Sequence, residues 1–173
     1  MTVAGLCTEA GLNERYFYES FSDRDTVATE VFDQVVGELA EAIVTAVAAA
    51  PDDSREKSRA AIAAAVELLT DDPRKARLIF IEAIAHRTLS ARRIEVMRNF
   101  SEIVLMQAQH FYGPKASLRV GDRANFAAVH LVGGLFETMN SWLNGDLNIT
   151  RDELIERSTD LFVLVGEHVA TGA

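Results

Sequence analysis

A single glycine near the amino end, flanked by two short amphipathic segments, is the feature that most constrains this chain. Before it, four small or apolar residues recur at three- and four-residue steps and predict a short helix with one apolar face: Val3, Leu6, Cys7 and Ala10. Gly11 can adopt the left-handed conformation that ends a helix without Cβ strain. Asn13 can then cap a second helix that begins near Glu14. The sequence therefore predicts two short helices joined by a tight turn.

The second helix has one face that can pack inward and other faces that remain open to a partner. Leu12, Phe17 and Phe21 can pack back on the first helix. The remaining faces carry polar and aromatic side chains: Glu14, Arg15, Tyr16, Tyr18, Glu19 and Ser20. A helix-turn-helix with such a second helix suits a DNA major groove. The alternative is that the aromatic residues form a core cluster in an ordinary helical hairpin.

The order of residues across this turn resembles the DNA-binding signature of TetR-family transcriptional regulators. In that signature a small-apolar helix is followed by Ala-Gly, an aliphatic residue, a cap, three variable residues and then apolar-Tyr-x-x-Phe-x-x-Lys. Residues 10–13 of this chain read Ala-Gly-Leu-Asn, and residues 17–24 read Phe-Tyr-Glu-Ser-Phe-Ser-Asp-Arg. Arg24 stands where the family usually has Lys.

The resemblance implies a double-stranded DNA operator as partner and assigns residues to it. Arg15 and Tyr16 would read base edges, and Glu14 would accept a hydrogen bond from a cytosine amino group. Phosphates would be held by three further residues: Tyr18, Ser20 and Arg24. The function implied is that of a transcriptional regulator, a repressor whose operator binding is controlled by a small, mostly apolar ligand.

Two features of the amino end depart from the family pattern. The family places a further helix, usually preceded by a basic arm, before this point, whereas the sequence opens at Met1 directly on the first predicted helix. We therefore expect either a truncated chain or an incomplete DNA-binding unit. Residues 1–25 also hold two basic against five acidic side chains, which leaves −3. Because phosphate neutralisation supplies most non-specific affinity, this segment alone should bind DNA weakly.

The rest of the chain predicts an all-α fold in which a partial helix-turn-helix head precedes a helical ligand-binding and dimerisation domain. The 173 residues, 49% of them hydrophobic, allow one sizeable core and a small appendage. We expect the head and its connecting helix at 1–46 and the second domain at 47–173. Helices are predicted at residues 24–50, 54–69, 74–85, 90–112, 123–143 and 150–170, with a loop from 113 to 121.

The last two predicted helices are apolar around more than one face, which indicates burial on more than one side. Paired glycines within a helix also let another backbone approach closely. By resemblance, these helices would pair with those of a second copy in a twofold homodimer. The predicted interface residues are Gly133, Gly134, Trp142, Leu161 and Phe162. Alternatively, the glycines only admit a large side chain within one subunit.

A small-molecule site in the body is implied by the resemblance, and several residues suit it. Four residues can line an apolar space: Met97, Phe100, Phe111 and Phe126. Gln107 and His130 are polar residues within apolar stripes, where one hydrogen bond could orient a ligand. The alternative is that each of these six is an ordinary core residue.

Other classes of function find little support in the sequence. Glu82 and His86 lie four residues apart, but the repeated Glu-x-x-His spacing of a helical di-metal site is absent, as are phosphate loops and nucleophile motifs. We therefore expect no enzyme, catalytic residue, metal or cofactor. One cysteine, a net charge of −9 and no apolar run of about 20 residues indicate a cytoplasmic protein that does not contact membranes. The remaining alternative is a dimeric small-molecule binder without DNA binding.

Overall fold

The structure is a computed structural model that describes residues 2–171, with side chains described for all of these except 114–121. Within the described residues every regular element is a helix, and the predicted all-α class is confirmed. The elements in chain order are α1 (Val3–Ala10), α2 (Glu14–Ser20), α3 (Arg24–Ala49), α4 (Ser54–Asp71), α5 (Pro73–Arg77), the π-helix η1 (Leu78–Glu82), α6 (Ala83–Ala85), α7 (Arg87–Tyr112), α8 (Pro114–Leu143) and α9 (Arg151–Thr171).

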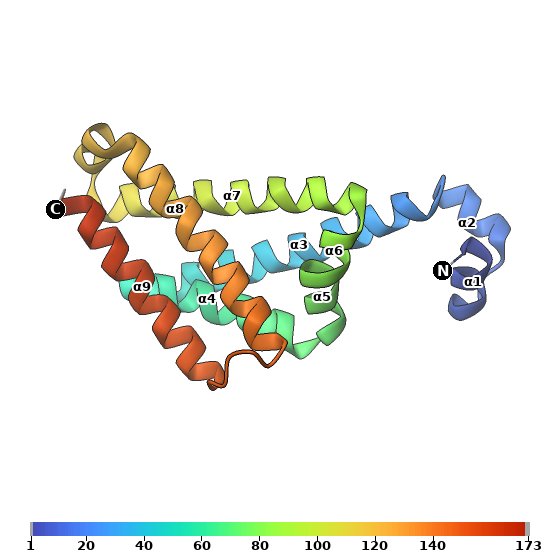
Figure 1. Ribbon diagram of the computed structural model, residues 1–173. Helices are drawn as coiled ribbons and strands as arrows, with labels where there is room; N and C mark the ends of the chain where they lie inside the picture. Colours follow the sequence, from blue (N-terminus) through green and yellow to red (C-terminus); the bar gives the residue numbers. More distant parts are fainter. Residues whose placement is uncertain (1, 172–173) are drawn as a thin grey trace.

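The long helix α3 links a small pair of helices to a larger helical body (Figure 1). Helices α1 and α2 lie at the amino end of α3, apart from the other helices. In the body, α3 packs against α4, α4 against α9, α8 against α9, and α7 against α8. The core cluster joins these helices through buried side chains from most of them, among which are Phe32, Val66, Leu89, Met139 and Leu154.

Side-chain caps set the starts of four helices where the sequence predicts them. Asn13 Oδ1 accepts from Arg15 N at 2.9 Å, and Asp23 Oδ1 accepts from Thr26 N at 2.8 Å. Asp53 caps α4 in the same way. A capping box is present at the start of α9: Thr150 N donates to Glu153 Oε2 at 2.9 Å, and Glu153 N donates to Thr150 Oγ1 at 3.2 Å. These bonds satisfy amide groups that a helix start leaves unpaired.

The predicted loop over residues 113–121 is wrong, because α8 already begins at Pro114. Gly113, at φ 81°, ends α7, and Pro114 at the first position of α8 starts the next helix. A proline at this position has its φ preset for a helix and gives up an amide that would be unpaired anyway. The glycine and proline therefore mark a sharp junction between two helices rather than a loop.

The segment predicted as one regular helix over 74–85 instead contains the π-helical turn η1. Its consecutive residues Ile79 and Phe80 are both buried. A π turn inserts one residue and so changes the direction in which the following side chains point. Apolar periodicity alone does not reveal such an insertion.

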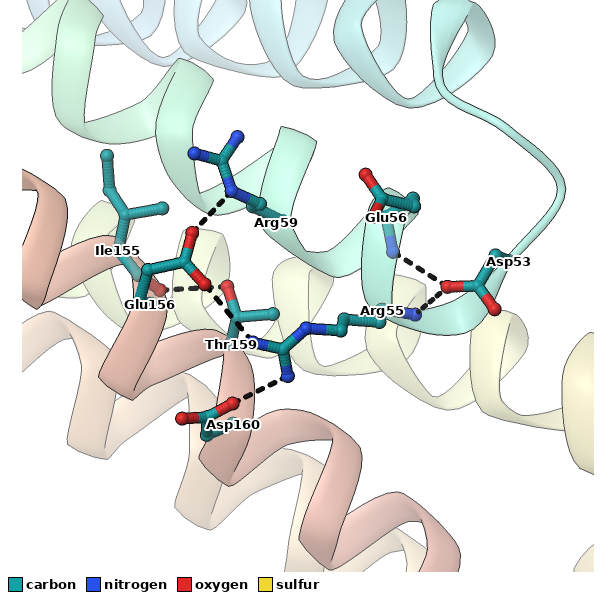
Figure 2. A network of polar contacts seen from close by, with 8 residues as sticks. All are labelled: Asp53, Arg55, Glu56, Arg59, Ile155, Glu156, Thr159 and Asp160. Atoms are coloured by element: carbon teal, nitrogen blue, oxygen red, sulfur yellow. Dashed lines mark hydrogen bonds and ion pairs between the residues drawn. The ribbon is translucent and has the colours of Figure 1, made fainter.

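Exposed arginine–carboxylate pairs join the amino end of α4 to the middle of α9 (Figure 2). Arg55 donates to both Glu156 and Asp160, and Arg59 donates to the other oxygen of Glu156. Hydrogen bonding from Arg59 lowers the pKa of the Glu156 carboxyl below its ordinary 4.5. Bidentate networks of this kind hold geometry better than single surface pairs. The network therefore adds polar contacts to the buried apolar packing of α9 on α4.

The lowered pKa of Glu156 predicts a specific acid sensitivity. A carboxyl whose pKa is lower in the folded state stabilises the fold above its unfolded pKa, and that contribution is lost as pH falls through 4.5 and below. We expect Glu156→Gln to lower the free energy of unfolding at neutral pH and to flatten its decline in acid. Urea unfolding at a series of pH values measures this. The exposed Glu67→Gln on α4 is the control, and equal pH slopes for both variants would contradict the assignment.

Candidate nucleic-acid interface and body cavity

The two amino-terminal helices form a small unit with a glycine turn and one buried residue on each helix. Gly11 has φ 65°, and amides at the turn donate to carbonyl groups at the end of α1: Leu12 N to Cys7 O at 2.8 Å and Gly11 N to Thr8 O at 3.2 Å. Cys7 and Phe17 are the buried residues of this unit. The predicted turn and cap are confirmed, but Leu12, expected to pack on the first helix, is 60% exposed.

The residues that the sequence assigns to DNA are all exposed, as is every residue of α2 except Phe17. Tyr16 and Tyr18 are 62% and 58% exposed, although large aromatic side chains are usually at least half buried. Arg15 is also exposed and pairs with Glu19 at 2.9 Å. The other assigned residues are exposed as well, on α2 and at the start of α3: Glu14, Ser20 and Arg24.

The alternative in which the aromatic residues form a core cluster holds for only part of α2. Phe17 is buried, with its ring centroid 5.6 Å from that of Phe21 and 5.3 Å from that of Tyr18. Tyr16 and most of Tyr18 stay outside the cluster. The helix therefore uses its phenylalanines for packing and leaves its tyrosine hydroxyl groups accessible to a partner.

The body contains a cavity of about 490 Å³ between α3, α4, α7, α8 and α9. Its wall is mostly aliphatic and aromatic, and its volume falls in the range of small-molecule sites. Polar side chains enter the lining at a few places: Ser54, Lys57, Ser58, Arg93, Gln107, Gln109 and Tyr112.

Four of the six residues predicted to contact a ligand line this cavity: Met97, Phe100, Gln107 and Phe111. The other two do not line it. Phe126 is 72% exposed on α8, and its ring stacks on that of His130 at 6.0 Å between centroids. The two residues lie four positions apart on an outward face of α8. The apolar periodicity of the sequence does not distinguish this face from the inward one.

The sequence does not assign Arg93 to the cavity, because three arginines close together, Arg92, Arg93 and Arg98, are typical of a solvated helix face. Arg93 lies four residues before Met97 and seven before Phe100, so all three share one side of α7. That spacing could have identified it. Its guanidinium carbon lies 4.4 Å from the centroid of the Phe136 ring, which also lines the cavity.

The residues predicted for a dimer interface divide between the inside and the outside of the subunit. Trp142 packs on the core and donates from Nε1 to Ile149 O at 2.8 Å, and Phe162 lines the cavity. A Cβ added at Gly133 would lie 3.8 Å from Met97 Cε, so this glycine faces inward. Gly134 faces open space, and Leu161 is 56% exposed. Further exposed apolar residues of α8 and α9 are Phe126, Val129, Leu143 and Leu164.

Two further features concern residues 2–171 without the side chains of 114–121. Within that part of the chain no group of three or more His, Cys, Asp or Glu side chains could hold a metal ion. No described helix is both long and apolar enough to cross a membrane.

The fold is similar to a crystal structure described as that of "the putative transcriptional regulator from Pseudomonas aeruginosa PAO1". The match has a TM-score of 0.77 and 15% sequence identity, and it covers 99% of this chain and 83% of that chain. No known family profile and no curated protein matches the sequence. At this level of identity the similarity shows a shared all-helical fold, that of a chain described as a regulator and not as an enzyme.

The glycine turn yields a matched pair of substitutions. Gly11→Ala places a Cβ at φ 65°, which costs about 1–2 kcal/mol, while nothing lies within 4 Å to clash with it. Gly37→Ala, on an open face of α3, should stabilise its helix by about 0.5–1 kcal/mol. We expect faster amide hydrogen exchange in α1 and α2 for Gly11→Ala only. Equal exchange in the two variants would show that the turn does not hold the pair together.

Proposed function

We propose that this protein is a TetR-type transcriptional regulator that binds an operator as a twofold dimer and responds to a small molecule in the body cavity. The observation that carries the proposal is the position of α3. Its first residue, Arg24, adjoins the exposed face of α2, and its later residues Val36, Leu39 and Ile43 line the cavity. One continuous helix thus spans both candidate sites. The fold shared with a described regulator supports the same assignment.

In this proposal α2 enters the major groove. Arg15 and Tyr16 contact base edges, with Glu14 accepting from a cytosine amino group. The phosphate contacts come from the residues that flank them: Tyr18, Ser20 and Arg24. Arg15 must leave Glu19 to reach a base, and breaking an exposed pair of this kind costs at most about 1 kcal/mol. Arg15 can therefore exchange Glu19 for a guanine edge at small cost.

The proposed domains are the head with its connecting helix at 1–46 and the ligand-binding and dimerisation body at 47–173. A ligand shifts an equilibrium only when it contacts two states of the protein differently. Because α3 residues form one wall of the cavity, a bound molecule would favour one tilt of α3 over another. A change in tilt moves α2, and with it the separation of two heads in a dimer. Operator affinity would change in consequence.

The proposed dimer joins the outward faces of α8 and α9. Leu161 and Leu164 are exposed on α9, and Phe126 and Val129 are exposed on α8. Gly134 leaves room beside them for an approaching backbone. Exposed apolar side chains grouped on two adjacent helices are typical of a surface that a partner covers. A twofold axis through such a face would pair each helix with its symmetry copy.

The DNA assignment predicts two distinct effects of substitution in the intact protein. Arg24→Gln should weaken binding to all duplexes alike and reduce the salt slope of log K by about 1, because one phosphate contact is lost. Arg15→Ala should instead change which sequence is preferred, by about 1–3 kcal/mol at one position. Anisotropy titration of mixed-sequence duplex at several salt concentrations measures the first effect. Selection from random duplexes measures the second.

Arg98→Gln, at an exposed position of α7 in the body, is the matched control and should change neither quantity. An equal loss of affinity in Arg98→Gln and Arg24→Gln would reject the assignment of α2 and its flank as the DNA surface. Absence of duplex binding by the folded wild-type protein would favour a dimeric small-molecule binder instead.

The dimer assignment predicts that charge on the α8 and α9 face separates the subunits. Gly134→Glu and Leu161→Glu each place a carboxylate on this face, and burying an unpaired charge there is strongly unfavourable. We expect both variants to sediment as monomers under conditions in which the wild type is a dimer. The control is Ile94→Glu at an exposed apolar position of α7, which should remain dimeric. Dimers that persist in the first two variants would remove these helices as the interface.

A further inference from the structure

Arg93 lines the cavity and has no anionic partner among the side chains that the structure describes. Its Nε is enclosed by protein and has no hydrogen-bond partner. Among the side chains that the structure describes, no carboxylate lies within ion-pair distance of its guanidinium. Its contact is with the face of Phe136, at 4.4 Å. A half-buried charge without a counter-charge is destabilising, so an anion beside this guanidinium would be favourable.

The other cation of the lining is already satisfied. Lys57 Nζ lies 3.6 Å from Asp52 Oδ1 and 3.4 Å from Val47 O. Arg92, next to Arg93, is also paired, with Asp33 at 2.6 Å and with Glu95 at 3.0 Å. Both carboxylates that pair with Arg92 are thus engaged. Of the two cations that line the cavity in the described part of the chain, Arg93 is the one without an anionic partner.

The shape of the cavity defines the remainder of the ligand. Its lining follows α3 from Phe32 to Ala48, a distance of about 24 Å at the rise of a helix. The ion pair of Arg92 with Asp33 places the Arg93 end beside the amino half of α3, and Lys57 marks the other end near Val47. Between these ends the wall is mainly apolar. An elongated hydrocarbon fits this wall, with a polar group at one end.

We propose that the cavity binds an amphipathic monoanion, an extended hydrocarbon chain that ends in one carboxylate, with the carboxylate on Arg93 and the chain running toward Lys57. The guanidinium would donate from its terminal Nη groups, which unlike Nε are not enclosed by protein, to the two carboxylate oxygens, as such groups do in bidentate pairs. The proposal rests on the proposed function only in taking this cavity as the ligand site. It places the charged end of the ligand beside the half of α3 that leads to the head.

Three probes with one alkyl chain test this proposal: dodecanoate, 1-dodecanol and dodecyltrimethylammonium. Each is used below its aggregation concentration to displace the uncharged dye Nile red from the protein. Because the protein carries a net charge of −9, non-specific attraction favours the cationic probe. We expect dodecanoate to displace the dye at a concentration about 10- to 100-fold lower than dodecanol does, the effect of one charge-assisted contact. The cation should be the weakest. Equal displacement by the acid and the alcohol would overturn the proposal.

Substitutions test whether the preference for dodecanoate depends on Arg93. Arg93→Met keeps an unbranched apolar stem and removes the charge, and should remove the preference for dodecanoate while leaving the affinity for dodecanol unchanged. Arg93→Lys should retain part of the preference, and Arg98→Met, an exposed arginine outside the lining, should retain all of it. Ala61→Phe fills the cavity and should weaken all three probes. A preference that survives Arg93→Met, or dodecanoate binding unaffected by Ala61→Phe, would overturn the proposal.

The test of the anion site and the test of the regulator proposal can fail independently. Displacement of the dye by the probes requires no DNA, and titration with a duplex requires no probe. Anion preference through Arg93 in a protein that binds no duplex would refute only the regulator. Duplex binding in a protein that prefers dodecanol would refute only the anion site. Should Arg93→Met fail to fold, the wild-type comparison of the three probes and the Arg93→Lys variant still decide the matter.

Discussion

Helix α3 is the constraint on which the rest of the molecule depends, because it is the continuous element between the head and the body. Asp23 fixes its first turn through the amide of Thr26, and Phe32, Val35 and Leu39 bury its inner face. Burial of such side chains contributes about 1.5–3 kcal/mol each, so the position of α3 is set by the core. The head, which lies at its amino end, takes its orientation from that position (Figure 1).

The body contacts α3 through the core cluster and through the cavity wall, which share residues. Phe32 belongs to the core cluster and also lines the cavity. The polar network of Figure 2 joins α9 to α4, so these two helices provide a stable frame. A ligand that fills the cavity therefore meets α3 within a frame that resists deformation. In our proposal this is why occupancy would be transmitted along α3.

Much of the helical framework could be predicted from the sequence, because helix starts depend on local chemistry. Asn13, Asp23, Asp53 and Thr150 act as caps through bonds to amides two or three residues away. The junction at Gly113 could not be predicted in the same way. Glycine and proline there fit a loop and a sharp turn between helices equally well, and the packing of α8 on α7 decides between them.

The two candidate sites could be predicted from the sequence to different degrees, because one depends on local helix pattern and the other on how helices pack together. The exposed face of α2 follows from a short helix with a single buried side, anchored by Phe17. The cavity lining was harder, because α8 has apolar residues on several faces and Phe126 turned out to lie on an outer one. Arg93 was missed because a charged residue is usually solvated, although its long stem can cover apolar surface. Its burial depends on where α7 meets Phe136.

The central claim is that α3 positions α2 for contact with a DNA duplex. Its most direct test is the selection of bound fragments from genomic DNA by the intact protein. The account predicts enrichment of a small set of fragments that share an inverted repeat, with half-sites about 34–36 Å apart or at a multiple of one helical turn. Recovery of fragments in their input proportions by a folded protein would contradict it.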